Sequence, residues 1–181
     1  MRATKRLTLS AVCVALSAIF LAIPTLPILE VFDLTAACFA SLIVAFIYIE
    51  VGSPYTWLVW VCTSLISAVM FFSSVMWVAY LFVFGLFPMV KGYAERAPHG
   101  AWIFLKLGFA NISVTALLLV STYLLGTPFY EDSFFGMPRA AFYILIYTTF
   151  NICFLLYDYF LTVMVRFYMA RIRPRIRHLL K

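Results

Sequence analysis

The chain has 181 residues, of which 66% are apolar and 11% are charged, with a formal net charge of +6. Water-soluble domains contain roughly 45–50% apolar and about 25% charged residues, so the composition excludes an ordinary soluble domain and indicates that lipid is the solvent. The basic residues lie beside the ends of apolar segments, where membrane topology explains them. Nucleic acid is therefore rejected as a partner.

Six apolar segments follow one another along the chain, and a membrane-spanning helix needs about 20 residues. The first helix is expected over residues 7–29. Its basic start resembles a signal peptide, but the apolar run is long and further spans follow, so a retained helix is predicted. The second and third helices are expected over residues 33–51 and 54–72, joined by a tight Gly52-Ser53-Pro54 turn.

The second half of the chain contributes three more predicted helices and a basic tail, over residues 75–90, 101–125, 139–167 and 168–181. Gly85 and Pro88 are expected to loosen the inner end of the fourth helix. The loop over residues 129–138 mixes acidic with aromatic side chains. Because no length remains for a soluble domain, residues 1–181 are predicted to form one all-α membrane domain with six transmembrane helices.

Lysines and arginines fall almost entirely on one side of the predicted membrane when the links between helices are assigned to alternate sides. Twelve of the 13 lie on the side that carries both termini, namely Arg2, Lys5, Arg6, Lys91, Arg96, Lys106, Arg166, Arg171, Arg173, Arg175, Arg177 and Lys181. Only Arg139 lies on the other side. Since basic residues near helix ends stay in the cytoplasm, both termini are predicted to be cytoplasmic in a multi-pass protein of the cell (plasma) membrane. We expect the basic face to contact anionic lipid headgroups.

The first predicted helix carries a stripe of small residues, at Ala11, Ala15, Ala18 and Ala22. Small side chains let helix backbones approach closely, which is how packing drives helix association in lipid. The stripe is either a docking face for another membrane protein or a packing face against a helix of the same chain. The pattern alone slightly favours packing within the chain.

The sixth predicted helix places Tyr147, Asn151, Asp158 and Thr162 at steps of four, seven and four residues, which keeps them on one face. A carboxylate at the depth of Asp158 is costly without a partner, and Lys106 of the fifth helix is the predicted one. Asp158 is then either a proton or cation site, a ligand anchor, or half of a structural ion pair, which is the favoured interpretation. Glu50 and Lys91 either extend this network or are simply solvated at the membrane interface, which is the safer interpretation.

Amides and aromatic side chains in the outer half are the candidates for a ligand pocket. Asn111 and Asn151 are deep, uncharged and polar, and each offers donors and acceptors. Aromatic walls are expected from Trp77 and Tyr80 of the fourth helix and from Tyr143 and Tyr147 of the sixth. Such a cavity suits a small, partly flat molecule.

Catalytic and metal-binding motifs are missing from the sequence. The four cysteines lie inside apolar segments without CxxC spacing, so a zinc or iron–sulfur site is not predicted. There is no GxxxxGK[ST] phosphate loop, no HExxH and no GxSxG motif. His99 and His178 lie in basic segments without the spacing of metal ligands. The chain is therefore not expected to be an enzyme or to need a cofactor.

Several stretches resemble the substrate-binding S components of energy-coupling factor transporters. They are the opening KRLTLSAVCVALSAIF with its AxxxA pattern, the FDLT before the second helix, and the stretches FGLFPMVKGYAER and NICFLLYDYFLTVMVR. The last two are similar to uncharacterised S-component-like membrane proteins of Gram-positive bacteria. The similarity covers nearly the whole chain at the level of pattern, together with six spans and both termini inside.

This resemblance implies a binding subunit for uptake of a small, vitamin-like molecule, powered by separate ATPases. It implies that the small face at Ala11, Ala15, Ala18 and Ala22 docks on a transmembrane coupling subunit. It also implies a pocket in the outer half, lined chiefly by the fourth to sixth helices. No motif specific to one vitamin is present, so the ligand is left open.

Two other functions stay open. Some rod-shape-determining membrane proteins have an S-component-like fold without a transported ligand, and a scaffold of this kind would use the basic tail and residues 91–100 as its working surface. A self-contained proton- or ion-coupled carrier would use Asp158. The carrier is disfavoured because six spans are few and no helix is predicted to be broken at mid-membrane, as such carriers often require.

Overall fold

The structure, a computed structural model, describes residues 3–25, 32–72, 74–96, 98, 100–126 and 138–175. Six helices among them are long and apolar enough to cross a membrane: Ala3–Thr25, Asp33–Glu50, Ser53–Met70, Val75–Ala94, Ala101–Tyr123 and Arg139–Arg175. They confirm the predicted all-α class and indicate a multi-pass membrane protein. Parts of three predicted segments lie outside the described residues, namely 26–29 of the first helix, 129–137 of the loop and 176–181 of the tail.

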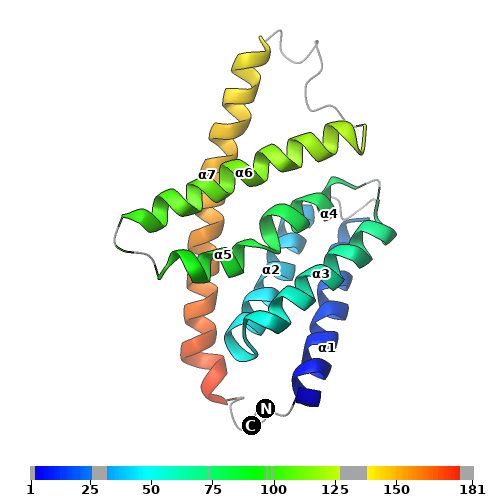
Figure 1. Cartoon of the computed structure of the whole chain (residues 1–181), viewed down its shortest axis with the longest axis vertical. Coiled ribbons are helices and arrows are strands. Elements are labelled where there is room, and N and C mark those ends of the chain that lie inside the picture. The colour runs from blue at the N-terminus through cyan, green and yellow to red at the C-terminus, as the bar shows by residue number, and fades with distance from the viewer. Residues whose placement is uncertain are drawn as a thin grey trace.

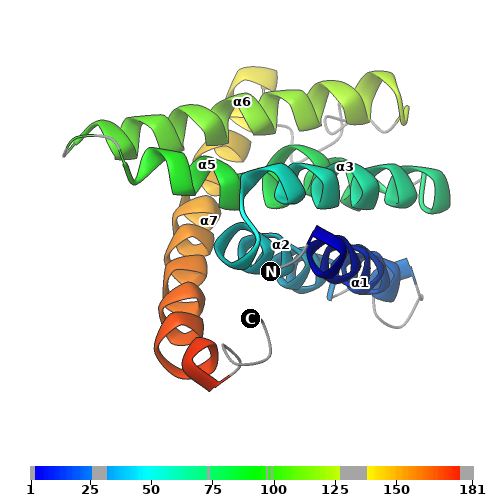
Figure 2. The ribbon, with the colours of Figure 1, turned by 60° about the horizontal axis from the view of Figure 1, so that its bottom comes forward.

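The first three helices pack together as one unit (Figures 1 and 2). They are α1 (Ala3–Ala22), which continues into the short 3-10 helix η1 (Ile23–Thr25), α2 (Asp33–Glu50) and α3 (Ser53–Met70). The buried residues of α1 are Ser10, Cys13, Val14, Ser17 and Leu21. Because several of these side chains are small, the α1 backbone lies close to its neighbours, which stabilises helix pairs in lipid.

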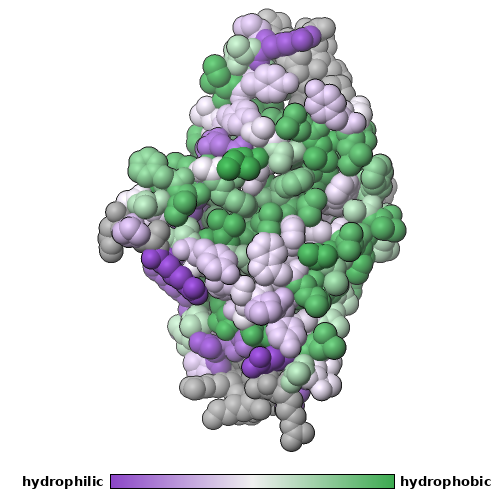
Figure 3. Space-filling view, in the orientation of Figure 1, coloured by the Kyte–Doolittle hydropathy of each residue, from purple (hydrophilic) through white to green (hydrophobic). Residues whose placement is uncertain are grey.

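The last two spans cross each other rather than lying side by side. They are α6 (Ala101–Tyr123) and α7 (Arg139–Phe167), and α7 continues into a π-helical turn, η4 (Tyr168–Ile172). In Figures 1 and 2, α7 runs steeply across the direction of α6. Both helices leave large apolar side chains exposed, and Figure 3 shows apolar side chains over much of the middle of the molecule. This surface suits contact with lipid tails.

The fourth span lies at the centre of the fold and is not a continuous α-helix (Figure 1). An α-helix, α4 (Val75–Ala79), passes at mid-span into a π-helical turn, η3 (Tyr80–Phe84), and the α-helix resumes as α5 (Phe87–Ala94). The loosening expected near Gly85 and Pro88 is present, but it begins earlier than predicted, at Tyr80, and reaches Gly85. The span nevertheless runs without a gap from Val75 to Ala94, so the π-turn alters the helical pattern without breaking the helix. π-turns are rare and often occur at functional sites.

Neighbouring helices stabilise the interruption with hydrogen bonds to its carbonyl groups. Trp60 of α3 donates from Nε1 to the Leu81 carbonyl at 3.1 Å, and Ser113 of α6 donates from Oγ to the Phe82 carbonyl at 2.9 Å. The Trp60 ring comes close because Gly85 has no side chain: a Cβ there would lie 2.5 Å from Trp60 Cδ1. An unsatisfied backbone group in lipid costs several kcal/mol, so these contacts make the π-turn tolerable at mid-span.

One end of the bundle collects the basic side chains of the described residues other than Arg139, and we refer to it as the basic end. Ser53 Oγ lies 3.0 Å from Tyr93 Oη, which joins the start of α3 to the end of α5. Tyr168 Oη donates to Glu50 Oε1 at 3.0 Å, which joins η4 to the end of α2. The start of α1 and the end of η4 also lie at this end (Figure 1). The grouping agrees with the sequence-based charge map, while the side of the membrane it faces stays a prediction.

Candidate functional site

Four charged side chains meet between α5, α6 and α7 near the basic end, and Lys91, Glu95, Lys106 and Asp158 are named here the ion cluster. Lys106 Nζ lies 2.8 Å from Asp158 Oδ2 and 3.0 Å from Oδ1. Lys91 Nζ contacts the same Oδ1 and donates to Thr162 Oγ1 at 2.6 Å. Glu95 Oε1 lies 3.2 Å from Lys91 Nζ and 3.5 Å from Lys106 Nζ. The cluster therefore ties three helices together.

The ion cluster is buried around Lys91, Lys106 and Asp158 and is exposed only at Glu95. Lys91 and Lys106 are 6% and 3% exposed, and the Asp158 side chain is 14% exposed, whereas the Glu95 side chain is 50% exposed. A buried ammonium group without an anion is costly, so both lysines depend on the Asp158 carboxylate. Glu95 connects the buried charges with the surface. The arrangement thus serves either as a structural joint or as a proton relay.

The structure brings together Asp158 and Lys106, the partner that the sequence predicted for it. Lys91 shares the same carboxylate, so its interpretation as an interfacially solvated residue was wrong. Glu50 does not join the cluster: its Oε1 lies 2.8 Å from Nε of Arg173 and accepts the Tyr168 hydrogen bond. Asp158 is therefore the centre of one network at the basic end and Glu50 of another.

The predicted amides form a polar seam with hydroxyl groups where α6 crosses α7. Asn151 Nδ2 donates to Asn111 Oδ1 at 3.1 Å and to the Tyr147 carbonyl at 2.8 Å. Asn111 Nδ2 donates to the Leu107 carbonyl at 2.8 Å, and Thr115 Oγ1 lies 2.7 Å from Tyr147 Oη. The bonds between Asn151 and Asn111 and between Thr115 and Tyr147 hold α6 against α7, while Asn151 Oδ1 is buried without a hydrogen-bond partner among the described residues.

The aromatic residues predicted as pocket walls do not converge. Trp77 is buried and donates from Nε1 to the Phe72 carbonyl at 3.0 Å. Tyr80 is completely buried within η3, and Tyr143 is exposed with its ring against Phe142. The six predicted pocket residues are thus spread over the α6–α7 seam, the core of the fourth span and the exposed start of α7.

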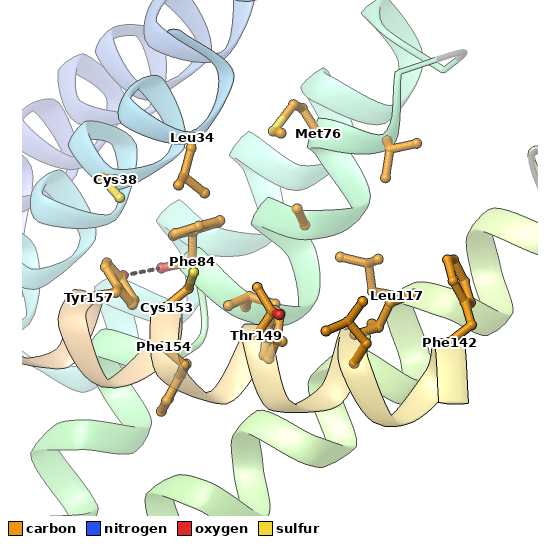
Figure 4. Close-up of a pocket in the computed structure, with 16 residues that line it drawn as sticks. Leu34, Cys38, Met76, Phe84, Leu117, Phe142, Thr149, Cys153, Phe154 and Tyr157 are labelled. Carbon is orange, nitrogen blue, oxygen red and sulfur yellow. Dashed lines mark hydrogen bonds between the residues drawn. The ribbon is translucent and has the colours of Figure 1, made fainter. Parts of the chain in front are cut away.

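A different set of residues lines a partly open hollow of the described structure, which we name the apolar cavity. Its volume is about 570 Å³. It lies between α2, the fourth span, α6 and α7, away from the basic end. Figure 4 shows Thr149 and Cys153 on the α7 wall, across from Leu34 of α2 and Met76 of α4. The lining residues are Leu34, Cys38, Val75, Met76, Ala79, Val83, Phe84, Leu117, Phe142, Leu145, Ile146, Thr149, Phe150, Cys153, Phe154 and Tyr157.

The few polar side chains of the apolar cavity offer little to a polar ligand. Tyr157 Oη is buried and donates to Ser41 Oγ at 2.6 Å, with the Phe84 carbonyl at 3.5 Å (Figure 4). The remaining polar groups in the wall are the Thr149 hydroxyl and the thiols of Cys38 and Cys153. A charged or strongly polar molecule would lose its hydration without gaining partners. The cavity therefore favours an apolar molecule.

The sequence contains one pattern, along α7, that indicates the apolar cavity. The polar residues of the same helix were chosen as pocket candidates instead. Along α7, the residues Phe142, Ile146, Thr149, Cys153 and Tyr157 recur at steps of three or four and line the cavity together. The polar residues of the same helix occupy a different face, toward α6. One face of α7 therefore lines the cavity, while another face contacts α6. An apolar face of a membrane helix does not by itself predict a cavity, because contact with lipid explains it equally well.

The stripe of alanines on α1, which we name the alanine face, does not lie against the other helices as the sequence slightly favoured. Ala11 and Ala15 are exposed, and Ala18 and Ala22 are half-buried. The buried face of α1 is formed by other residues. Packing within the chain was therefore the wrong interpretation for Ala11 and Ala15.

Among the described residues, no group of three or more His, Cys, Asp or Glu side chains is placed to hold a metal ion. His99 and His178 lie outside the described residues. No protein-family model, no curated protein and no solved structure matches the chain.

Proposed function

We propose that the chain is the binding subunit of a membrane transport system, which captures an apolar small molecule in the apolar cavity and depends on a separate ATP-driven coupling module. The observation that carries the proposal is the cavity itself. Its volume of about 570 Å³ lies within the roughly 300–1,000 Å³ typical of small-molecule pockets. Whether the purified protein retains such a molecule is the direct test, and the Discussion gives its design.

The apolar residues of the cavity wall favour a narrower class of ligand than the vitamin-like molecule expected from the sequence. Burial of apolar surface from water contributes about 25 cal/mol per Å², so an apolar molecule arriving from the aqueous side gains from entering. Asn111, Asn151 and Tyr147 hydrogen-bond with each other or with the backbone, outside the cavity. A ligand with an apolar body therefore fits the proposal better than one recognised through amides.

The alanine face supports the second half of the proposal, docking on a coupling subunit. Exposed small side chains at Ala11 and Ala15 leave the α1 backbone open to close approach by a partner helix. We expect Ala15→Leu to reduce co-purification with a coupling subunit at least tenfold, because its added bulk separates the two backbones. Ligand retention should stay unchanged, since Ala15 does not line the apolar cavity.

The matched control for this prediction is Leu16→Trp, which adds bulk at an exposed position of α1 outside the alanine face. Both variants are co-expressed with candidate coupling subunits and purified through a tag on the coupling subunit. If Ala15→Leu and the unaltered chain co-purify with the coupling subunit in equal amounts, the alanine face is not the docking surface.

A second candidate function, a proton-coupled carrier, is favoured by the π-turn of the fourth span. Such turns often occur at functional sites, and here η3 borders the cavity while α5 carries Lys91 of the ion cluster. A carrier should take up protons in liposomes that contain this chain alone, and Glu95→Gln should slow that uptake without unfolding the protein. Absence of uptake by the unaltered chain would exclude the carrier.

A further inference from the structure

A second hollow lies at the basic end, between the last two turns of α2 and the end of α7, and we name it the basic groove. Its volume is about 250 Å³. Its α2 wall extends from Leu42 to Ile49, which corresponds to about 10 Å along a helix. The lining side chains are apolar apart from one tyrosine hydroxyl: Leu42, Ala45, Phe46, Ile49, Met164, Val165, Phe167, Tyr168 and Ile172.

Polar contacts fix the rim of the basic groove. Glu50 Oε1 accepts a hydrogen bond from Tyr168 Oη at 3.0 Å and lies 2.8 Å from Arg173 Nε. The Phe46 ring packs edge-on against the Tyr168 ring, with centroids 5.5 Å apart. The single carboxylate at this rim is thus already neutralised, and the two helices are held apart at a defined spacing.

Two further arginines lie close to the rim in the chain and add positive charge near it. Arg171 lies within η4 and Arg175 lies just after it, so both are close in the chain to the lining residues Tyr168 and Ile172. Both are exposed, and neither makes an ion pair with another described residue. The groove therefore combines an apolar wall with exposed arginines that lie close to it in the chain.

We propose that the basic groove is a binding site for an anionic phospholipid, with one acyl chain along the α2–α7 wall and the phosphate against Arg171 and Arg175. Basic pockets between transmembrane helices are the sites where anionic headgroups bind. The apolar wall requires a chain as well as a headgroup, so free phosphate does not satisfy the site. This proposal is independent of the apolar cavity and holds whether or not the chain takes part in transport.

The test is native mass spectrometry of the purified full chain in detergent doped with phosphatidylglycerol or, separately, phosphatidylcholine. The unaltered chain should retain phosphatidylglycerol preferentially, and Arg171→Gln/Arg175→Gln should weaken its retention about 30-fold, as the loss of two cation–headgroup contacts implies. Equal retention of both lipids by the unaltered chain, or undiminished retention by the variant, would overturn the site.

The matched control is Lys5→Gln/Arg6→Gln, which removes the same charge at the basic end but on α1. The control should retain phosphatidylglycerol as the unaltered chain does. If the control loses as much lipid as the arginine variant, the lipid is held by the overall positive charge and not by the groove. A second variant, Ile172→Trp, tests the groove if the arginine variant does not fold. Brominated phosphatidylglycerol should quench its added fluorescence more strongly than brominated phosphatidylcholine, and equal quenching would overturn the proposal.

Discussion

Replacing Asp158 with asparagine is expected to lower the free energy of unfolding by roughly 3–5 kcal/mol, the usual consequence of removing one partner from a buried ion pair. The change leaves Lys91 and Lys106 facing each other with only the half-exposed Glu95 as a counter-ion. Equilibrium unfolding in mixed micelles of a mild detergent and SDS, followed by circular dichroism, measures the difference.

Two further variants separate the ion cluster from general effects of charge. Glu95→Gln is the control, and it should cost under about 1 kcal/mol because its side chain is half-exposed. The variant Lys91→Met/Lys106→Met/Asp158→Leu removes all the buried charges together and should recover most of the lost stability. An Asp158→Asn protein as stable as the unaltered chain would contradict the role of the cluster in joining α5, α6 and α7.

Helix number and the approximate helix bounds could be predicted because lipid imposes strong rules on sequence. Long apolar runs mark the spans, and α6 and α7 begin at Ala101 and Arg139 as expected. The same rules made the partner of Asp158 predictable. A deep carboxylate needs a cation at matching depth, and Lys106 met that requirement.

The interruption of the fourth span could not be predicted, because its cause is distributed over the chain. The carbonyls of η3 accept hydrogen bonds from Trp60, Ser113 and Tyr157, which belong to three other helices. Only the tertiary arrangement brings those donors to one place. The local sequence showed Gly85 and Pro88, which suggested a loosened inner end rather than a π-turn at mid-span.

The cavity lies where a pocket was expected, among the fourth to sixth spans and away from the basic end, but the residues predicted to line it do not do so. Asn111, Asn151 and Tyr147 were chosen because polar groups in a membrane usually have a function. In lipid, however, polar groups also hydrogen-bond with each other across helices. Asn151 donates to Asn111 and the Tyr147 hydroxyl pairs with Thr115, which holds α6 against α7. The wall that encloses space is built from residues such as Phe150 and Leu117, whose side chains give no distinctive signal in sequence.

Filling the apolar cavity should abolish ligand capture while leaving the fold intact. Thr149→Phe/Cys153→Phe places two rings from the α7 wall into the hollow, and both positions are exposed in the structure, so the rings displace ligand rather than core side chains. We expect at least a hundredfold loss of retained molecule. The matched control is Ile144→Phe/Ile152→Phe, which places the same rings on exposed positions of α7 outside the cavity.

The measurement is mass spectrometry of small molecules extracted from the three purified proteins after identical detergent exchange. The account predicts that an apolar molecule accompanies the unaltered chain and the Ile144→Phe/Ile152→Phe control in similar amounts, and is lost from Thr149→Phe/Cys153→Phe. No retained molecule in the unaltered chain, or equal amounts in all three proteins, would contradict the central claim that the apolar cavity is a binding site.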